Sequence, residues 1–312
     1  SLMTISVLRT ADGWWVQTPD GAVKVQTSAV TTAELLADRA AVKATAGSPV
    51  PVGTLSLLSP VTKPCRVIAQ MTNFASHVKD AGLDPKTIPL TFFRKSSASI
   101  SGPFDPIVKP THVKLLDYEV EIGLVVGRDI ACGTRISEQD LPDVIAGLVI
   151  TNDVSARDVQ LPQTQFYEAK SYPSFTPAGP ALVLLDAGEL KHFGQLRLRL
   201  SVNGDTRQNA LVDGDMMYKP LQALQSLTRF QDLSAGDLIL TGTPVGTALS
   251  APPKPVEMIS RLLPPAVKWK AFFKSQAANP KYLKDGDVVE ASVRTDDGAI
   301  DLGTQRMTVK YA

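Results

Sequence analysis

The chain has 312 residues, of which 44% are hydrophobic and 20% are charged, and its formal net charge is +1. Its basic residues are spread along the sequence rather than gathered in one block, so nucleic acid is not an expected partner. No apolar run reaches the ~18 residues that a membrane span needs. The two cysteines, Cys65 and Cys132, are too few for a disulfide framework and lack metal-site spacing, which favours a reducing cytoplasm.

The first sixty residues predict a small β-rich domain. Short alternating apolar runs are separated by Asp12-Gly13 and Asp20-Gly21, and an Asp-Gly step between strands is a strong hairpin signal. An alanine-rich segment at 31–45 is compatible with a helix. Prolines then cluster, as expected of a boundary. We therefore expect a β-rich N-terminal domain at 1–62 and a catalytic domain at 63–312.

The remaining chain predicts many short strands and few long helices. This pattern argues against a doubly wound parallel sheet. We predict a mostly β fold with some α (α+β), organised as a mixed sheet or barrel-like roll. The expected strands are 65–69, 90–95, 117–127, 145–152, 181–185, 196–202, 237–241, 287–294 and 306–311, and the expected helices are 73–81, 137–143, 216–227 and 254–277.

Two glutamates interrupt an otherwise apolar strand in the segment LDYEVEI. Glu119 and Glu121 are two positions apart, so in a strand they share one face, roughly 6–7 Å from each other. Ionised carboxylates are costly in an apolar setting, and neighbouring ones repel each other unless a cation intervenes. The pair therefore indicates either a cation site or a strand face that is turned to solvent.

A third carboxylate follows the next apolar strand, in the segment TNDVSARDVQ. Asp153 lies where the strand gives way to a turn. Three carboxylates without histidine or cysteine would select a hard divalent ion, Mg²⁺, Mn²⁺ or Ca²⁺, rather than zinc. The alternative is that Asp153 caps a turn or a helix.

Two further segments are compatible with anion binding. Lys170 opens the proline-rich run KSYPSFTPAGP, where a lysine can neutralise a carboxylate or an enolate. The segment LILTGTPVGT is a strand that runs into a turn, whose amides and hydroxyls can bind anions. A solvated lysine and an ordinary strand end are the alternatives.

Taken in order, LDYEVEIGLVVG, AGLVITNDVSARDVQ, KSYPSFTPAGP and LILTGTPVGT resemble the fumarylacetoacetate hydrolase family. The resemblance covers roughly residues 63–312 and implies a mixed β-roll that forms homodimers, often behind a smaller N-terminal domain. The family includes C–C hydrolases, decarboxylases, isomerases and hydratases, so the resemblance does not specify the substrate. It implies metal ligands at Glu119, Glu121 and Asp153, a substrate-contacting lysine at Lys170, and a pocket lined by Arg157, Gln160 and Thr243.

A general base is implied by the segment from Thr72 to Asp80, which resembles the family's Asn-aromatic-Ala-x-His helix. His77 would activate water, oriented by an acid three residues on, and such residues are neighbours on a helix. Related enzymes carry Glu where this chain has Asp80. The alternative is an ordinary surface histidine.

The function that follows is divalent-metal-dependent hydrolysis of a C–C bond in a 2-oxo or 1,3-dioxo carboxylic acid, such as an acylpyruvate, through an enolate. Mg²⁺ or Mn²⁺ is the expected cofactor, with Ca²⁺ as an alternative. Decarboxylation or isomerisation of oxaloacetate or a hydroxyhepta-dienedioate, as in aromatic catabolism, would use the same site. A non-catalytic metal- or ligand-binding protein is the rival class. Fumarylacetoacetate itself is less expected, because 67–71 lacks the carboxylate that the namesake enzyme adds as a further ligand.

Residues 248–284 form a longer connection than the family usually has. The segment could pack on its own domain, cover the pocket or contact a dimer partner. A helix lying on a membrane surface is disfavoured, because Pro264-Pro265 interrupts the helix.

Overall fold

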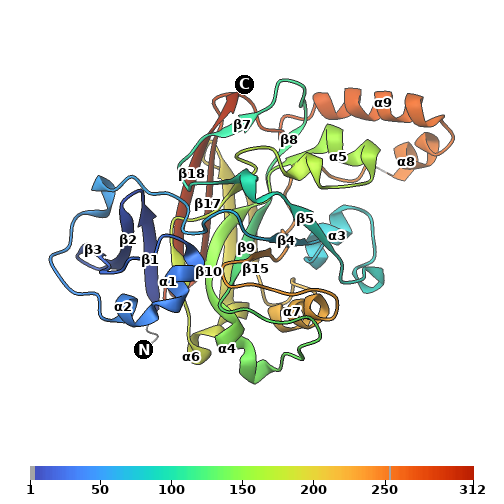
Figure 1. Ribbon diagram of the computed structural model, residues 1–312. Coiled ribbons are helices and arrows are strands. Elements are labelled where there is room, and N and C mark those ends of the chain that lie inside the picture. The colour runs from blue at the N-terminus through green and yellow to red at the C-terminus, as the bar shows by residue number, and fades with distance from the viewer. Residues whose placement is uncertain (1–3, 253) are drawn as a thin grey trace.

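The computed structural model describes residues 4–252 and 254–312, and its framework is a pair of β-sheets (Figure 1). The larger sheet has nine strands, in the order β3 (Gly21–Lys24), β2 (Gly13–Thr18), β1 (Ile5–Thr10), β13 (Leu182–Leu184), β10 (Ile145–Asn152), β9 (Val120–Val126), β16 (Leu238–Leu240), β4 (Val67–Gln70) and β5 (Phe92–Lys95). The smaller has five, in the order β15 (Asp205–Leu211), β14 (Leu196–Val202), β17 (Val288–Thr295), β18 (Asp301–Tyr311) and β7 (Ile107–Lys109).

Short elements complete the fold. Two two-stranded pairs join β8 (Leu116–Asp117) to β11 (Ser155–Ala156) and β6 (Ile100–Ser101) to β12 (Thr176–Pro177). The helices are α1 (Thr32–Ala37), α2 (Arg39–Lys43), α3 (Ala75–Asp80), α4 (Leu141–Val144), α5 (Arg157–Gln163), α6 (Ala187–Leu190), α7 (Pro220–Thr228), α8 (Lys254–Ser260) and α9 (Pro265–Ala277). The mixture of parallel and antiparallel strand pairs within one sheet, together with short helices, agrees with the predicted fold class.

Strand β9 is buried on both faces, because the larger sheet lies between two hydrophobic cores. Side chains alternate along a strand. Leu124 belongs to the main core, which includes side chains of both sheets, whereas Val125 belongs to the second core, to which α1 and α2 contribute. Glu121 therefore shares the face of Val125 and is directed away from the smaller sheet.

The N-terminal strands extend the larger sheet. The predicted hairpins are confirmed, since Thr10 pairs with Gly13 between β1 and β2, and Thr18 pairs with Gly21 between β2 and β3. Strand β1 is in turn hydrogen-bonded to β13. The sheet is thus continuous across residue 62, and the domain division at that residue stays a prediction.

Several elements differ from the sequence-based expectation. The helix expected over 31–45 is interrupted at Asp38, between α1 and α2, and the helix expected over 254–277 is interrupted before Pro265. Proline is favoured in the first turn of a helix, because it donates no backbone hydrogen bond there. Helix α5 was not expected, since it is short and contains Pro162.

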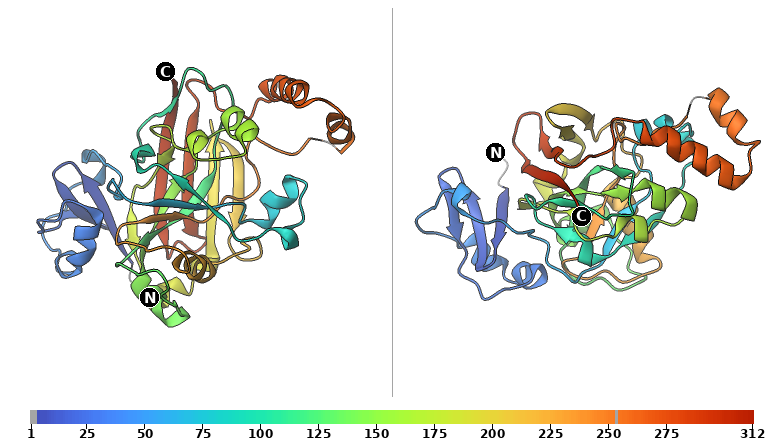
Figure 2. Two further views of the ribbon diagram at one scale, coloured as in Figure 1. Left: turned by 45° about the vertical axis from the view of Figure 1, so that its right-hand side comes forward. Right: turned by 90° about the horizontal axis from the view of Figure 1, so that it is seen from above.

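Helices α8 and α9 form an arm that projects from the body (Figures 1 and 2). None of the described residues of these two helices is buried. The rings of Trp269, Phe272 and Phe273 contact one another, and Phe273 packs against the main core. The contact of Phe273 with the main core therefore accounts for how the arm is attached to the body. Covering of the pocket and contact with a dimer partner stay predictions. Among the described residues, no helix has the length and apolarity to cross a membrane.

We expect Gly123→Ala to destabilise the protein, because an added Cβ at this position in β9 would lie 2.8 Å from Thr151 Cγ2 and 2.9 Å from Leu238 Cδ1. Overpacking of this kind costs about 1–3 kcal/mol of the free energy of unfolding, which urea denaturation would measure. Gly53→Ala is the control, since a Cβ there meets no atom within 4 Å. Equal stability of the two variants would contradict the close packing around β9.

Candidate active site

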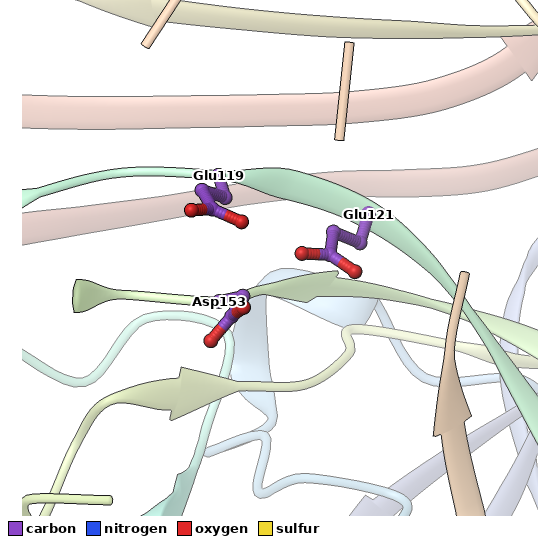
Figure 3. Close-up of side chains that lie close together, drawn as sticks. All are labelled: Glu119, Glu121 and Asp153. Atoms are coloured by element: carbon purple, nitrogen blue, oxygen red, sulfur yellow. The ribbon is translucent and has the colours of Figure 1, made fainter. Parts of the chain in front are cut away.

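Three carboxylates converge where the N-terminal end of β9 meets the C-terminal end of β10. The strands are antiparallel, with Glu121 opposite Thr151, and the Asp153 amide donates to the Glu119 carbonyl at 2.8 Å. One oxygen of each of Glu119, Glu121 and Asp153 lies within 4.8 Å of the other two, and all three residues are buried. Figure 3 shows their side chains gathered between the two strands. Their role as metal ligands is still a prediction.

The two glutamates differ in their electrostatic surroundings. Burial alone would raise the pKa of Glu119, but the positive charges of Lys170 and Arg157 outweigh it and hold that pKa below its usual value. Burial raises the pKa of Glu121 well above its usual value, and the carboxylates of Asp153 and Glu119 raise it further. Glu121 does accept a hydrogen bond from the Gly242 amide at 2.7 Å. A cation is nevertheless what would keep it ionised.

Asp153 lies between two lysine ammonium groups. Lys170 Nζ donates to Asp153 Oδ2 at 2.7 Å, to Ser155 Oγ at 2.8 Å and to Glu119 Oε2 at 3.2 Å. Lys95 Nζ donates to Asp153 Oδ1 at 2.7 Å and to the Phe175 carbonyl at 2.7 Å. Burial opposes a charge on Lys170, yet Asp153 and Glu119 outweigh it and raise its pKa. Lys170 is therefore held as an ammonium ion.

Lys95 is the site residue that sequence reasoning missed. It ends β5, where it pairs with Val67 of β4, and Val67 faces the second core, as Glu121 does. Its signal in the sequence was faint, a lysine that follows Phe92, Phe93 and Arg94 at a strand end. Only the pairing of β4 with β5 shows that this lysine is directed inward.

Arg157 and Gln160, predicted to line the pocket, are both buried on α5. The Arg157 guanidinium donates from Nη2 to Glu119 Oε2 at 2.7 Å, from Nη1 to Gln160 Oε1 at 2.9 Å and from Nε to Asp117 Oδ2 at 2.9 Å. Residues three apart on a helix are neighbours, which explains the contact with Gln160. The structure thus joins Arg157 directly to the carboxylate cluster.

Thr243 lies in the turn after β16, beside the same cluster. Its hydroxyl donates to the Val120 carbonyl at 2.8 Å and accepts from Gln208 Nε2 at 2.8 Å. In this structure the hydroxyl therefore fastens the turn to β9, and its contact with substrate stays a prediction.

His77 lies on α3, close enough to the cluster for Glu119, Arg157 and Lys170 to influence its pKa. Burial lowers the pKa of His77; Glu119 acts in the opposite direction, and Arg157 again lowers it. Its Nδ1 atom is buried and has no hydrogen-bond partner among the described residues. No hydrogen bond or ion pair in the described part of the chain joins His77 to Asp80. The predicted pairing is therefore not formed in this structure, and the dyad stays a prediction.

Contacts with residues distant in sequence fix the position of α3. Asp215 accepts from the Ser76 amide at 2.7 Å and from the Ser76 hydroxyl at 2.6 Å, which satisfies donors at the start of the helix. Asn73 Nδ2 donates to the Thr241 carbonyl at 2.8 Å and so ties the preceding turn to the end of β16. These contacts place His77 beside the strand ends that carry the carboxylates.

The buried groups at this end of the sheet do not balance in charge. Four carboxylates face three cationic side chains, so the net charge is −1 when all are ionised. A divalent ion would change it to +1. The donor set of oxygens fits a hard divalent cation, and the unfavourable position of Glu121 gives that cation a physical reason to bind. The groups counted are Asp117, Glu119, Glu121 and Asp153 against Lys95, Arg157 and Lys170.

A family model described as fumarylacetoacetate hydrolase, C-terminal, matches residues 66–310. The chain therefore belongs to the fumarylacetoacetate hydrolase family and is an enzyme of that family, as the motifs predicted. Members of this family generally use divalent metals, and the buried acidic cluster could hold one.

Among curated relatives, the mitochondrial oxaloacetate tautomerase Fahd2a of Rattus norvegicus is 34% identical over 205 residues, which cover 65% of this chain and 63% of that protein. Oxaloacetate tautomerase YisK of Bacillus subtilis strain 168 is 34% identical over 205 residues, which cover 64% of this chain and 66% of that protein. The chain thus matches slightly less than two thirds of the length of these relatives.

Solved structures share the fold over the whole chain. The crystal structure of a probable 2-hydroxyhepta-2,4-diene-1,7-dioate isomerase from Mycobacterium abscessus superposes with a TM-score of 0.74 at 28% identity, and it covers 99% of both chains. This likeness confirms the predicted fold class.

We expect Lys95→Met to destabilise the metal-free protein, because it leaves Asp153 Oδ1 and the Phe175 carbonyl without their buried donor. Removing one partner of a buried ion pair costs about 3–5 kcal/mol of the free energy of unfolding. Urea denaturation in EDTA would measure the loss. The control is Lys24→Met, whose ion pair with Asp12 is exposed and worth less than about 1 kcal/mol. A similar loss in both variants would contradict a buried role for Lys95.

Proposed function

We propose that this chain catalyses proton transfer at the carbon beside the carbonyl group of a small 2-oxo carboxylic acid, through an enolate. The observation that carries the proposal is the buried cluster of carboxylates, which is one positive charge short of neutrality when all of its groups are ionised. With a divalent ion bound, the same cluster becomes net positive and attracts an anionic substrate.

Glu119, Glu121 and Asp153 are the residues that would hold the ion, Mg²⁺ or Mn²⁺ in our proposal. The ion supplies Lewis-acid stabilisation of negative charge that develops on a substrate oxygen. The protein contributes three buried oxygen donors and a surrounding set of cations that orient two of them, Glu119 through Arg157 and Asp153 through Lys95 and Lys170.

Lys170 places a second positive charge beside the cluster. Its contacts with Glu119, Asp153 and Ser155 fix the ammonium group, and its Nζ lies 5.1 Å from the centre of the Phe93 ring. A fixed charge against an apolar wall stabilises an enolate more than a solvated lysine would, because little water is present to screen it.

The names of the relatives favour a rearrangement. One group is named as oxaloacetate tautomerases, and a structural neighbour is described as a probable hydroxyhepta-diene-dioate isomerase. Tautomerisation and isomerisation move a proton without cleaving a C–C bond: in our proposal, solvent water takes the proton from the carbon, and solvent returns a proton to the enolate oxygen or to another carbon. We therefore place oxaloacetate and related dioates first among the substrates to be tested.

Hydrolysis of a C–C bond is the second candidate, and His77 is the observation that favours it. Burial lowers the pKa of His77, so its imidazole is neutral near pH 7 and able to accept a proton from water. A rearrangement or a decarboxylation needs such a water-activating base less.

A homodimer and a cytoplasmic location belong to the proposal as well. The family resemblance supports the first and the cysteine content supports the second, while the rat relative is named as a mitochondrial protein. The expected partner is a small-molecule oxo acid, and neither nucleic acid nor a membrane is expected.

We expect EDTA to abolish turnover and Mg²⁺ or Mn²⁺ to restore it in a screen of oxaloacetate, acylpyruvates and hydroxyhepta-dienedioate. Glu119→Ala should lower the restored rate by roughly 10–100-fold or more, because a ligand is lost. Glu290→Ala removes an exposed glutamate that pairs with Arg306 and should keep the wild-type rate. Metal binding without turnover of any of these acids would instead support a non-catalytic binding protein.

We expect His77→Ala to lower acylpyruvate hydrolysis by roughly 10²–10⁴-fold, the usual contribution of a general base. Tautomerisation and decarboxylation of oxaloacetate should change little. Both rates would be measured on one preparation, with His112→Ala as the control, since His112 is exposed. Equal loss of both activities would refute this division of labour.

A further inference from the structure

Asp117 is fully buried and ends β8, two residues before Glu119. Asp117 carries the same kind of carboxylate as the residues of the cluster, but its hydrogen-bonding surroundings are different. Both of its oxygens are saturated by donors of this chain. Oδ1 accepts from the amides of Tyr118 at 2.8 Å and Ala248 at 2.9 Å, and Oδ2 accepts from the Leu249 amide at 2.9 Å and Arg157 Nε at 2.9 Å.

The saturation of Asp117 limits how Arg157 contacts Glu119. A guanidinium tends to form two parallel hydrogen bonds to one carboxylate. Here Nε is committed to Asp117 and Nη1 to Gln160, so only Nη2 reaches Glu119, at 2.7 Å. The single contact falls on Oε2, the oxygen that Lys170 also contacts. No donor among the described residues is hydrogen-bonded to Glu119 Oε1.

We infer that Asp117 is a positioning residue, which holds Arg157 on one oxygen of Glu119 and thereby leaves Oε1 for the divalent ion. The inference rests on the proposed function, because it assumes that Glu119 binds that ion. Without Asp117, the freed edge of the guanidinium can pair with both oxygens of Glu119 and compete with the cation.

A purely structural role would look different. Asp117 also accepts from the amides of Ala248 and Leu249, which begin the segment that leads to the α8–α9 arm. If this anchoring were its whole contribution, loss of the carboxylate would lower stability and leave the affinity of the cluster for a cation unchanged.

The test is Mn²⁺ binding, measured by electron paramagnetic resonance on the whole 312-residue chain. Asp117→Asn should weaken Mn²⁺ binding by roughly 10–100-fold, the usual effect of removing a group that orients a metal ligand. Asp237→Asn is the matched control. Asp237 is buried and accepts from Arg66 and the Ser234 amide, so this variant should lose stability but keep wild-type affinity.

A double-mutant cycle separates positioning from anchoring. If Asp117 acts through Arg157, then Asp117→Asn should change Mn²⁺ affinity less than about twofold in an Arg157→Gln background, because coupled residues are not additive. The same loss of affinity in both backgrounds would overturn the inference. If Asp117→Asn does not fold, Asp117→Glu keeps the charge but displaces it by one methylene, and unchanged affinity in that variant would overturn the inference as well.

The outcomes also distinguish this inference from the proposed function. Tight Mn²⁺ binding by wild type and Asp117→Asn alike would refute the positioning role alone. Weakened binding in Asp117→Asn, together with no turnover by wild type, would uphold the positioning role and refute the proposed reaction. Absence of Mn²⁺ binding by wild type would refute both.

Discussion

Burial of four carboxylates at one end of a β-sheet is the constraint on which the rest of this structure depends. Each carboxylate taken out of water is unfavourable unless a cation or a set of donors compensates it. The chain supplies Lys95, Arg157 and Lys170 from three separate segments for that purpose. The positions of β5, α5 and the loop before Phe175 therefore depend on the same charges as the site does.

Compensation is unequal across the cluster, and the inequality has a chemical consequence. Glu119 contacts two cations, Asp153 contacts two, and Glu121 is hydrogen-bonded to a backbone amide. The pKa values of the two glutamates therefore shift in opposite directions. Glu119 and Asp153 are already held in place by cationic side chains, whereas Glu121 has no cation of its own among the described residues. A divalent ion would therefore supply the missing positive charge with little rearrangement of the side chains.

The cations that stabilise the carboxylates are also those that an anionic substrate would meet. Lys170 illustrates this dual role, since it is fixed by Asp153 and Ser155 and lies against the Phe93 ring. Such a group requires no rearrangement when negative charge develops on a substrate. In the proposed reaction, the same residue would serve both stability and catalysis. Its ion pairs with Glu119 and Asp153 explain why a lysine is tolerated at this buried position.

Much of the site could be predicted from short stretches of sequence, because the signals were local. Glu119 and Glu121 share a strand face, and Asp153 follows a recognisable apolar strand. Lys95 and Asp117 could not be predicted in this way. Lys95 contacts a residue 58 positions away and Asp117 one 40 positions away. The Lys95 contact depends on strand register, and the Asp117 contact depends on helix α5, which the sequence did not predict because it contains Pro162.

The sequence by itself determined the family, the alternating strands and the acidic residues that the strands carry, because hydrophobic periodicity and motif spacing depend only on the order of the residues. Tertiary structure alone decided which cation meets which carboxylate and that His77 is not hydrogen-bonded to Asp80. It also decided that the N-terminal strands join the main sheet. The physical reason is that hydrogen bonds and ion pairs act over about 3 Å, a distance that only the folded arrangement of distant segments sets.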